Sequence, residues 1–162
     1  MYRESIQFSE SQFPLASNEI RLLAELGYIA TSCGQVDSAT AIFDALISLR
    51  STKSFPYIGK AIAFLYVGLL TPAVDLLSAA SQVVKIDQEQ IWLYLALAFK
   101  RSGSEGKARK ILEHLITSGE LNEVDMVFAK AILEIDSKSI HGLPKPFPVA
   151  DVGIIDSATV AR

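Results

Sequence analysis

The chain has 162 residues, a usual length for one domain, and 50% of them are hydrophobic while 20% are charged. This composition, with a mean hydropathy of +0.32, excludes an intrinsically disordered chain. The formal net charge of −3, from 15 Lys and Arg against 18 Asp and Glu, argues against a general polyanion binder, and no nucleic-acid partner is expected. The single cysteine, Cys33, cannot form an internal disulfide and indicates a reducing compartment.

A membrane span is not expected. The longest uncharged stretch, residues 61–74, has 14 residues, whereas a spanning helix needs about 20 apolar residues. The N-terminus carries Arg3, Glu4 and Glu10 and no apolar run, so it does not have the form of a signal peptide. The sequence therefore predicts a cytoplasmic protein without a membrane partner.

Prolines and hydrophobic periodicity divide the chain into three parts. Residues 1–16, with Pro14 near their end, are predicted to be an N-terminal arm. Residues 17–136 show apolar side chains at helical spacing and form the predicted domain. Residues 137–162 contain Pro144, Pro146 and Pro148 and are predicted to be an extended or flexible tail. Seven helices are predicted, at residues 18–33, 36–50, 55–67, 72–85, 88–102, 105–118 and 123–136.

Four polar residues mark the expected helix starts. Thr71 precedes a proline at the first predicted position of its helix, and Ser104 precedes an acidic residue. Asp87 is followed three residues later by Gln90, the spacing of a capping box. Asn122 begins the last helix, which is predicted to cap the open end of the domain.

A repeat runs through the helical part. Gly34, Gly68 and Gly103 are spaced by 34 and 35 residues. Alanines follow at the same two intervals, each five residues after its glycine: Ala39, Ala73 and Ala108. With each alanine at position 20 of a 34-residue unit, position 4 is large (Leu23, Tyr57, Trp92), position 8 is small (Gly27, Ala61, Ala96), and position 24 is large (Phe43, Leu77, Leu112). Position 11 is Ala30, Phe64 and Phe99.

This pattern resembles the tetratricopeptide repeat (TPR), in which positions 4, 11 and 24 are large and positions 8 and 20 are small. Small side chains let the two helices of a pair approach closely, and a glycine lets the first helix end in a left-handed conformation. Lys60 at position 7, Ala30 at position 11 and the lack of proline at position 32 are departures from the family pattern. The resemblance implies an all-α fold, a right-handed superhelical stack of three TPR-like helix pairs with a C-terminal capping helix.

Catalytic chemistry is not expected. His114 lies on a predicted outer helix without a nucleophile or carboxylate placed to work with it, and Cys33 is interpreted as a buried structural thiol. The sequence has no zinc-ligand spacing and no glycine-rich phosphate loop, so no metal, cofactor or catalytic residue is predicted. The one basic cluster is interpreted as a solvated turn and helix face; it comprises Lys100, Arg101, Lys107, Arg109 and Lys110.

In TPR superhelices, the first helix of each pair lines the concave surface through positions 2, 5, 9, 12 and 13. The resemblance therefore predicts an inner surface with large apolar side chains, and these are the candidate protein-binding residues: Tyr28, Phe55, Ile58, Ile62, Leu65, Tyr66, Leu93 and Leu97. An exposed patch of this kind is costly in water and is expected to be covered.

Four interpretations of this patch are open. It binds a separate polypeptide, it packs against neighbouring helices, it is covered by the apolar tail, or it is buried in a homodimer. The basic inner surface that grips acidic chaperone C-termini is not present, since the first unit has Ala24 and Tyr28 there. An apolar groove suits an amphipathic helix or an extended apolar segment.

The short chain with three degenerate repeats and an apolar groove is similar to the small TPR chaperones of bacterial type III secretion. Those proteins hold a needle or translocator subunit in the cytosol before secretion. The resemblance covers residues 18–136 and implies a non-catalytic, virulence-related chaperone that sequesters an apolar or amphipathic segment of one secreted partner. The expected protein partner is a secreted needle or translocator subunit, or a co-chaperone. The alternative is a TPR scaffold or assembly component that joins proteins without releasing a client.

Overall fold

The computed structural model describes residues 15–135, and the predicted arm (1–16) and tail (137–162) fall almost entirely outside this range. The described residues form seven α-helices and no β-strand. Their bounds are α1 Ser17–Ser32, α2 Val36–Leu49, α3 Phe55–Tyr66, α4 Leu70–Val83, α5 Gln88–Arg101, α6 Glu105–Ser118 and α7 Glu123–Glu134. Every predicted helix is present, and no end differs from the prediction by more than two residues.

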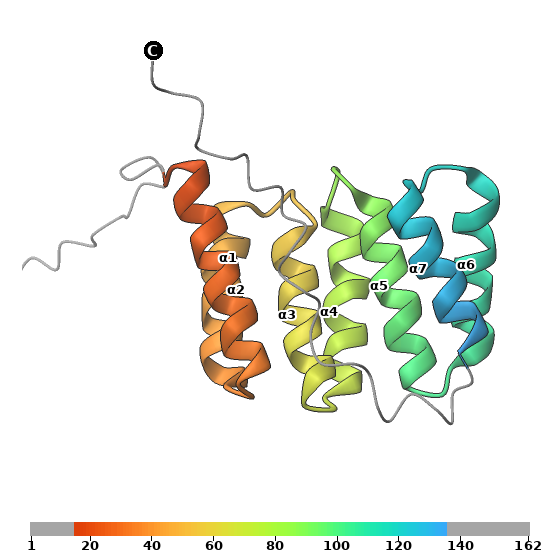
Figure 1. Ribbon diagram of the computed structural model, residues 1–162, viewed down its shortest axis with the longest axis horizontal. Helices are drawn as coiled ribbons and strands as arrows, with labels where there is room; N and C mark the ends of the chain where they lie inside the picture. Colours follow the sequence, from red (N-terminus) through yellow and green to blue (C-terminus); the bar gives the residue numbers. More distant parts are fainter. Residues whose placement is uncertain (1–14, 136–162) are drawn as a thin grey trace, which may run out of the picture.

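The helices form a stack of antiparallel pairs in chain order, with α1–α2 at one end and α6 and α7 at the other (Figure 1). The first helix of each pair, called helix A here, is α1, α3 or α5, and its partner, helix B, is α2, α4 or α6. Each helix B also packs against the helix A that follows it, so that α2 contacts α3 and α4 contacts α5. This nearest-neighbour packing is the architecture of a TPR-like stack, and the predicted all-α fold is confirmed.

Small residues lie at the crossing points of the helix pairs, as the repeat pattern predicts. Ala39, Ala73 and Ala61 have no exposed surface, and Ala108 is 1% exposed. The large side chains at position 24 fill the space that the alanines leave, and Phe43, Leu77 and Leu112 are all fully buried. The small and large positions therefore interlock, which holds each pair together.

Glycine ends helix A in each repeat. Gly34, Gly68 and Gly103 have φ angles of 72°, 83° and 80°, a left-handed conformation that side chains with a Cβ rarely adopt. The predicted role of these three glycines is confirmed. The Oδ1 atom of Asn122 accepts a hydrogen bond from the backbone N–H of Asp125 at 2.8 Å, so the predicted N-cap of α7 is also confirmed.

Three other predicted caps need correction. Helix α4 begins at Leu70, so Thr71 lies inside it and Pro72 is its third residue, still within the turn whose N–H groups have no helical partner. Asp87 precedes α5 with φ of 58° and its side chain makes no capping hydrogen bond. Instead, the Gln90 side chain accepts a hydrogen bond from the Ser54 hydroxyl, 3.2 Å away on the preceding repeat. Ser104 stands at the N-terminus of α6 as predicted but its side chain makes no capping hydrogen bond.

Candidate protein-binding surface

The A helices form the inner side of the stack. Helices α1, α3, α5 and α7 contact one another in succession, whereas consecutive B helices are farther apart. A stack that is narrower on one side curves toward that side, so the A helices line its concave surface. Helix α7 takes the place of a fourth helix A and packs against both α5 and α6 (Figure 1).

The structure buries half of the side chains that the repeat pattern assigned to this surface. Ile58, Leu65, Leu93 and Leu97 are 5%, 3%, 0% and 7% exposed and belong to the central hydrophobic core. The expectation that they line an open groove is wrong. The reason is that α3 and α5 each lie between two other A helices, which cover the side chains directed along the stack. A role of these four residues in partner binding stays a prediction.

The other four predicted residues keep some exposed surface. Phe55 and Tyr28 are half-buried beside the core cluster of the first repeat, and Ile62 is half-buried beside the central core. Tyr66 is 43% exposed, and its hydroxyl donates a hydrogen bond to the carbonyl oxygen of Ser32, 3.2 Å away on α1. Tyr66 therefore links two repeats as well as facing solvent.

Tyr28 packs against another aromatic ring. Its ring meets that of Phe43 edge to face, with centroids 5.3 Å apart and an interplanar angle of 64°. Burial raises the pKa of the Tyr28 phenol to about 12, because the phenolate loses its hydration there. The hydroxyl is accordingly protonated at neutral pH and can donate a hydrogen bond.

Two aromatic residues of this surface were missed by the sequence analysis. Tyr94 on α5 and Phe128 on α7 stack at a tilt, with ring centroids 5.7 Å apart, and both are half-buried. Burial raises the pKa of the Tyr94 phenol above its ordinary range, and the charges of Tyr28 and Asp125 raise it further. Side chains from α1, α5 and α7 thus lie close enough to interact electrostatically across the concave surface.

The repeat interval contained a signal for these residues. Ala131 follows Ala96 by 35 residues, the same interval that separates Ala96 from Ala61. Continuing the repeat into α7 assigns Phe128 to inner position 5, the equivalent of Leu93. The prediction treated α7 only as a cap and stopped the pattern one helix early.

Two members of the basic cluster are part of the fold, which corrects the prediction of a solvated face. Lys100 is 7% exposed, and its Nζ atom donates a hydrogen bond to the Leu133 carbonyl oxygen at 3.1 Å. The Nη1 atom of Arg101 donates to the Leu65 carbonyl oxygen at 2.6 Å. Both cations lie at helix C-termini, where carbonyl groups without helical partners and the helix dipole favour positive charge. Lys107, Arg109 and Lys110 are exposed as predicted.

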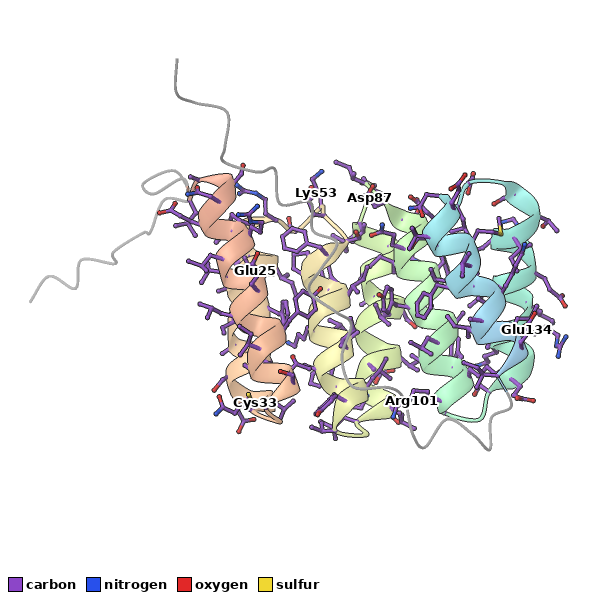
Figure 2. All side chains as sticks on the ribbon, in the orientation of Figure 1. Glu25, Cys33, Lys53, Asp87, Arg101 and Glu134 are labelled. Carbon is purple, nitrogen blue, oxygen red and sulfur yellow. The ribbon has the colours of Figure 1, made fainter. Side chains whose placement is uncertain are left out.

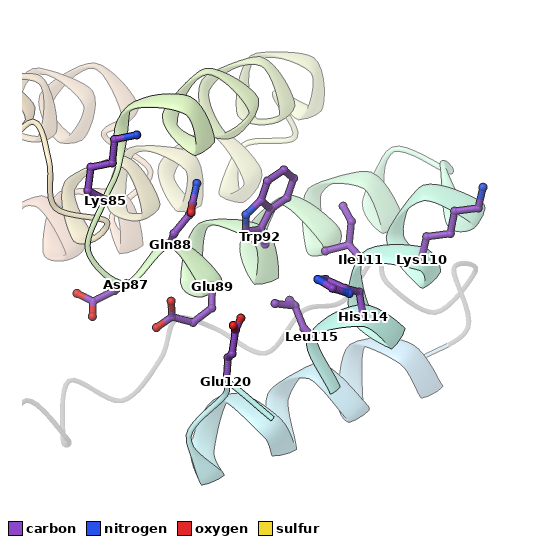
Figure 3. A pocket seen from close by; sticks show the side chains of 10 residues that line it. All are labelled: Lys85, Asp87, Gln88, Glu89, Trp92, Lys110, Ile111, His114, Leu115 and Glu120. Atoms are coloured by element: carbon purple, nitrogen blue, oxygen red, sulfur yellow. The ribbon is translucent and has the colours of Figure 1, made fainter. Parts of the chain in front are cut away.

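Two candidate reactive side chains are on the surface. Cys33 is exposed at the end of α1, so the prediction of a buried thiol is wrong (Figure 2). His114 is exposed, as predicted, and lines an open depression of about 750 Å³ between α5 and α6. Figure 3 shows His114 and Lys110 to the right of the Trp92 ring. The carboxylates of Asp87, Glu89 and Glu120 lie below the ring and to its left. Within residues 15–135, no group of three or more His, Cys, Asp or Glu is placed to hold a metal ion.

No helix in the described part of the chain is both long enough and apolar enough to cross a bilayer.

The fold and its inner surface define a tetratricopeptide-repeat-like protein. Two similar solved structures are those of PcrH with the chaperone binding region of PopD and with that of PopB, at TM-scores of 0.58 and sequence identities of 22% and 21%. Each likeness covers 74% of this chain, with 92% and 98% of PcrH respectively. The Arabidopsis OM64 TPR domain is similar at a TM-score of 0.52 and 20% identity, over 71% of this chain and 94% of that domain.

The sequence comparisons are sparser. No family model matches the chain. Superkiller protein 3 of Saccharomyces cerevisiae is 28% identical over 79 residues, which is 49% of this chain and 6% of that protein. These likenesses agree with the TPR-like architecture that the repeat pattern predicts.

Proposed function

We propose that this protein is a non-catalytic cytoplasmic chaperone that holds an apolar or amphipathic segment of a type III secretion partner on its concave surface. The observation that carries the proposal is the gathering of half-buried aromatic and aliphatic side chains on the A helices. The fold likeness to PcrH, whose solved complexes contain the chaperone binding regions of PopD and PopB, supports this type of partner. A needle or translocator subunit is the expected client.

The binding surface comprises the accessible part of the predicted set together with the two aromatic residues on α5 and α7: Tyr28, Phe55, Ile62, Tyr66, Tyr94 and Phe128. Partner side chains would displace water from these rings and from Ile62, which stabilises the complex by the hydrophobic effect. The proposed contact area is smaller than the sequence predicted, because four of the predicted residues are buried. They lie beneath the surface and support it: Ile58, Leu65, Leu93 and Leu97.

Two phenol groups add a polar component to this surface. Within residues 15–135, the Tyr28 and Tyr94 hydroxyls make no hydrogen bond, and their raised pKa values keep them protonated as donors. A bound segment buries backbone carbonyl groups, which need donors once water is excluded. An apolar segment whose backbone carbonyl groups face these two hydroxyls would bury its apolar side chains and also find hydrogen-bond donors for its carbonyl groups.

Site-specific photo-crosslinking in the native cell tests the proposal. A photoreactive phenylalanine analogue replaces Ile62 or Tyr94 on the concave surface, and His114 on the outer helix α6 in the control. The proposal expects the same partner to be captured from both concave positions and not from the control position. Capture only at His114, or no shared partner at the two concave positions, would contradict it.

The alternative scaffold function is favoured by a different observation, the exposed apolar side chains at both ends of the stack, such as Leu26 on α1 and Val127 on α7. The fate of the captured partner in cells without this protein separates the two functions. The partner of a chaperone aggregates or is degraded, whereas the partners of a scaffold stay soluble but unassembled.

A further inference from the structure

The open depression between α5 and α6, called the α5–α6 depression here, combines an aromatic ring with charges of both signs. Its charged lining consists of three basic side chains and three carboxylates: Lys85, Lys110, His114, Asp87, Glu89 and Glu120. Lys110 and His114 are one turn apart on α6, whereas Glu89 lies on α5 and Glu120 follows α6. The α6 cations and the carboxylates lie on different sides of the Trp92 ring (Figure 3).

The depression is a feature of the third repeat and not of the stack in general. Glu89 and Trp92 keep exposed surface and line it. Their equivalents 35 residues earlier, Ser54 and Tyr57, are only 3% and 9% exposed, and the Tyr57 hydroxyl donates a hydrogen bond to the Ser51 carbonyl oxygen at 3.1 Å. The second repeat therefore buries the side chains at these two positions, and the third repeat leaves them accessible.

The opposite charges are not paired across the depression. Within residues 15–135, the side chains of Glu89, Glu120, Lys110 and His114 form no hydrogen bond or ion pair. The axes of two packed helices are about 8–10 Å apart. A ligand that carries both charges can therefore pair with the carboxylates and with the α6 cations at the same time.

The lining determines the chemistry of such a ligand. The face of a tryptophan ring attracts a Lys or Arg side chain, and the carboxylates of Glu89 and Glu120 add to this attraction. Lys110 and His114 attract a carboxylate on the other side of Trp92. Apolar side chains of α6 that also line the depression favour an apolar linker: Ile111 and Leu115. A nucleotide or other polyanion is disfavoured because three carboxylates line the same depression.

We propose that the α5–α6 depression binds a segment of a second protein in which a basic and an acidic residue flank two apolar residues. In an extended segment, residues three positions apart are about 10 Å apart, which matches the separation of the two helices. Trp92 and Tyr94 are two residues apart on α5, so their side chains point about 200° apart around the helix. The depression and the concave surface therefore lie on opposite sides of α5, and the proposal does not depend on the proposed chaperone function.

Trp92 is the single tryptophan of the chain, so its fluorescence reports directly on the depression. The full-length protein is titrated with the peptide acetyl-Arg-Leu-Leu-Glu-amide, with excitation at a wavelength that tyrosine does not absorb. We expect a saturable change in Trp92 emission. Replacing the peptide's arginine by citrulline, or its glutamate by glutamine, should each weaken binding about three- to fivefold, the effect of losing one exposed ion pair. No saturable change, or equal binding of the uncharged analogues, would overturn the proposal.

A charge reversal tests which side chain binds the acidic residue. Lys110→Glu should reverse the preference, so that acetyl-Arg-Leu-Leu-Arg-amide binds more tightly than acetyl-Arg-Leu-Leu-Glu-amide. Arg109→Glu makes the same charge change on α6 at a residue that does not line the depression, and it should keep the wild-type preference. Circular dichroism verifies that both variants are folded. An unchanged preference in Lys110→Glu, or an equal reversal in Arg109→Glu, would overturn the proposal, since the latter would show an effect of net charge alone.

Discussion

The Arg101 guanidinium on α5 donates a 2.6 Å hydrogen bond to the carbonyl oxygen of Leu65 at the C-terminal end of α3. Tyr66, the equivalent of Arg101 in the preceding repeat, makes the corresponding bond to Ser32 on α1. The side chain at repeat position 13 thus connects α3 to the C-terminal end of α1 and α5 to the C-terminal end of α3. These bonds connect adjacent repeats by a polar contact in addition to the hydrophobic core.

Arg101→Ala is expected to lower the free energy of unfolding by about 1.5–3 kcal/mol, the range for hydrogen bonds to charged groups, because the Leu65 carbonyl loses a charged donor. Urea denaturation followed by circular dichroism measures the loss. Arg109→Ala is the control, since the Arg109 side chain is 62% exposed and forms a weak, solvent-exposed ion pair with Glu113, 3.8 Å away. Equal stability of the two variants would contradict a structural role for the Arg101 bond.

Gly59→Ala is expected to destabilise the fold by about 1–3 kcal/mol through overpacking. A Cβ atom on Gly59 would lie 2.2 Å from Cε1 of Phe43, a fully buried ring that also packs against Gly27. Gly106→Ala is the matched control: no atom lies within 4 Å of its added Cβ, and the change should stabilise α6 by up to about 1 kcal/mol. Thermal unfolding of both variants measures the difference. A Gly59→Ala protein as stable as the wild type would show that the Phe43 ring can move aside.

Ile62→Asp is expected to abolish capture of the partner at Tyr94 while leaving the helical content nearly unchanged. The reason is that Ile62 is only half-buried on the concave surface, so the carboxylate can reach water. Leu93→Asp is the contrasting variant, because Leu93 is fully buried and an unpaired carboxylate there should unfold the domain. Circular dichroism and the crosslinking yield are measured together. Unfolding of Ile62→Asp would place Ile62 in the core and exclude it from the binding surface.

The stability of the protein is expected to decrease between pH 10 and pH 12 in part because of Tyr28. The phenol pKa is about 10 in the unfolded chain and about 12 in the folded protein, so the fold favours the protonated form. This contribution is complete below pH 10 and is lost as the pH rises through 12. Tyr28→Phe cannot ionise and should lose less stability over this range than the wild type. Urea denaturation at pH 9 and at pH 11.5 measures both losses, and identical losses would contradict the raised pKa.

The sequence alone predicted the helices and their turns because these depend on local interactions. Apolar spacing located every described helix to within two residues, and Gly34, Gly68 and Gly103 marked turns that require a left-handed backbone. The repeat interval also identified the small residues at the helix crossings, since two helices approach closely only where side chains are small. The caps at Thr71 and Asp87 were predicted incorrectly: α4 begins one residue before Thr71, and the Asp87 side chain makes no capping hydrogen bond, while the Gln90 side chain accepts a hydrogen bond from Ser54 on the preceding repeat.

Tertiary structure decided which of the inner positions are accessible. Ile62 and Leu97 are both aliphatic residues at position 9 of their repeats, yet Leu97 is buried in the central core whereas Ile62 is only half-buried. Tertiary structure also decided the role of Lys100 and Arg101. The sequence shows that both are cations, but the carbonyl groups to which they donate hydrogen bonds lie on helices about 35 residues away in the chain. Burial and hydrogen bonding at these positions depend on helices distant in the chain, and their arrangement is set by packing, which no local pattern contains.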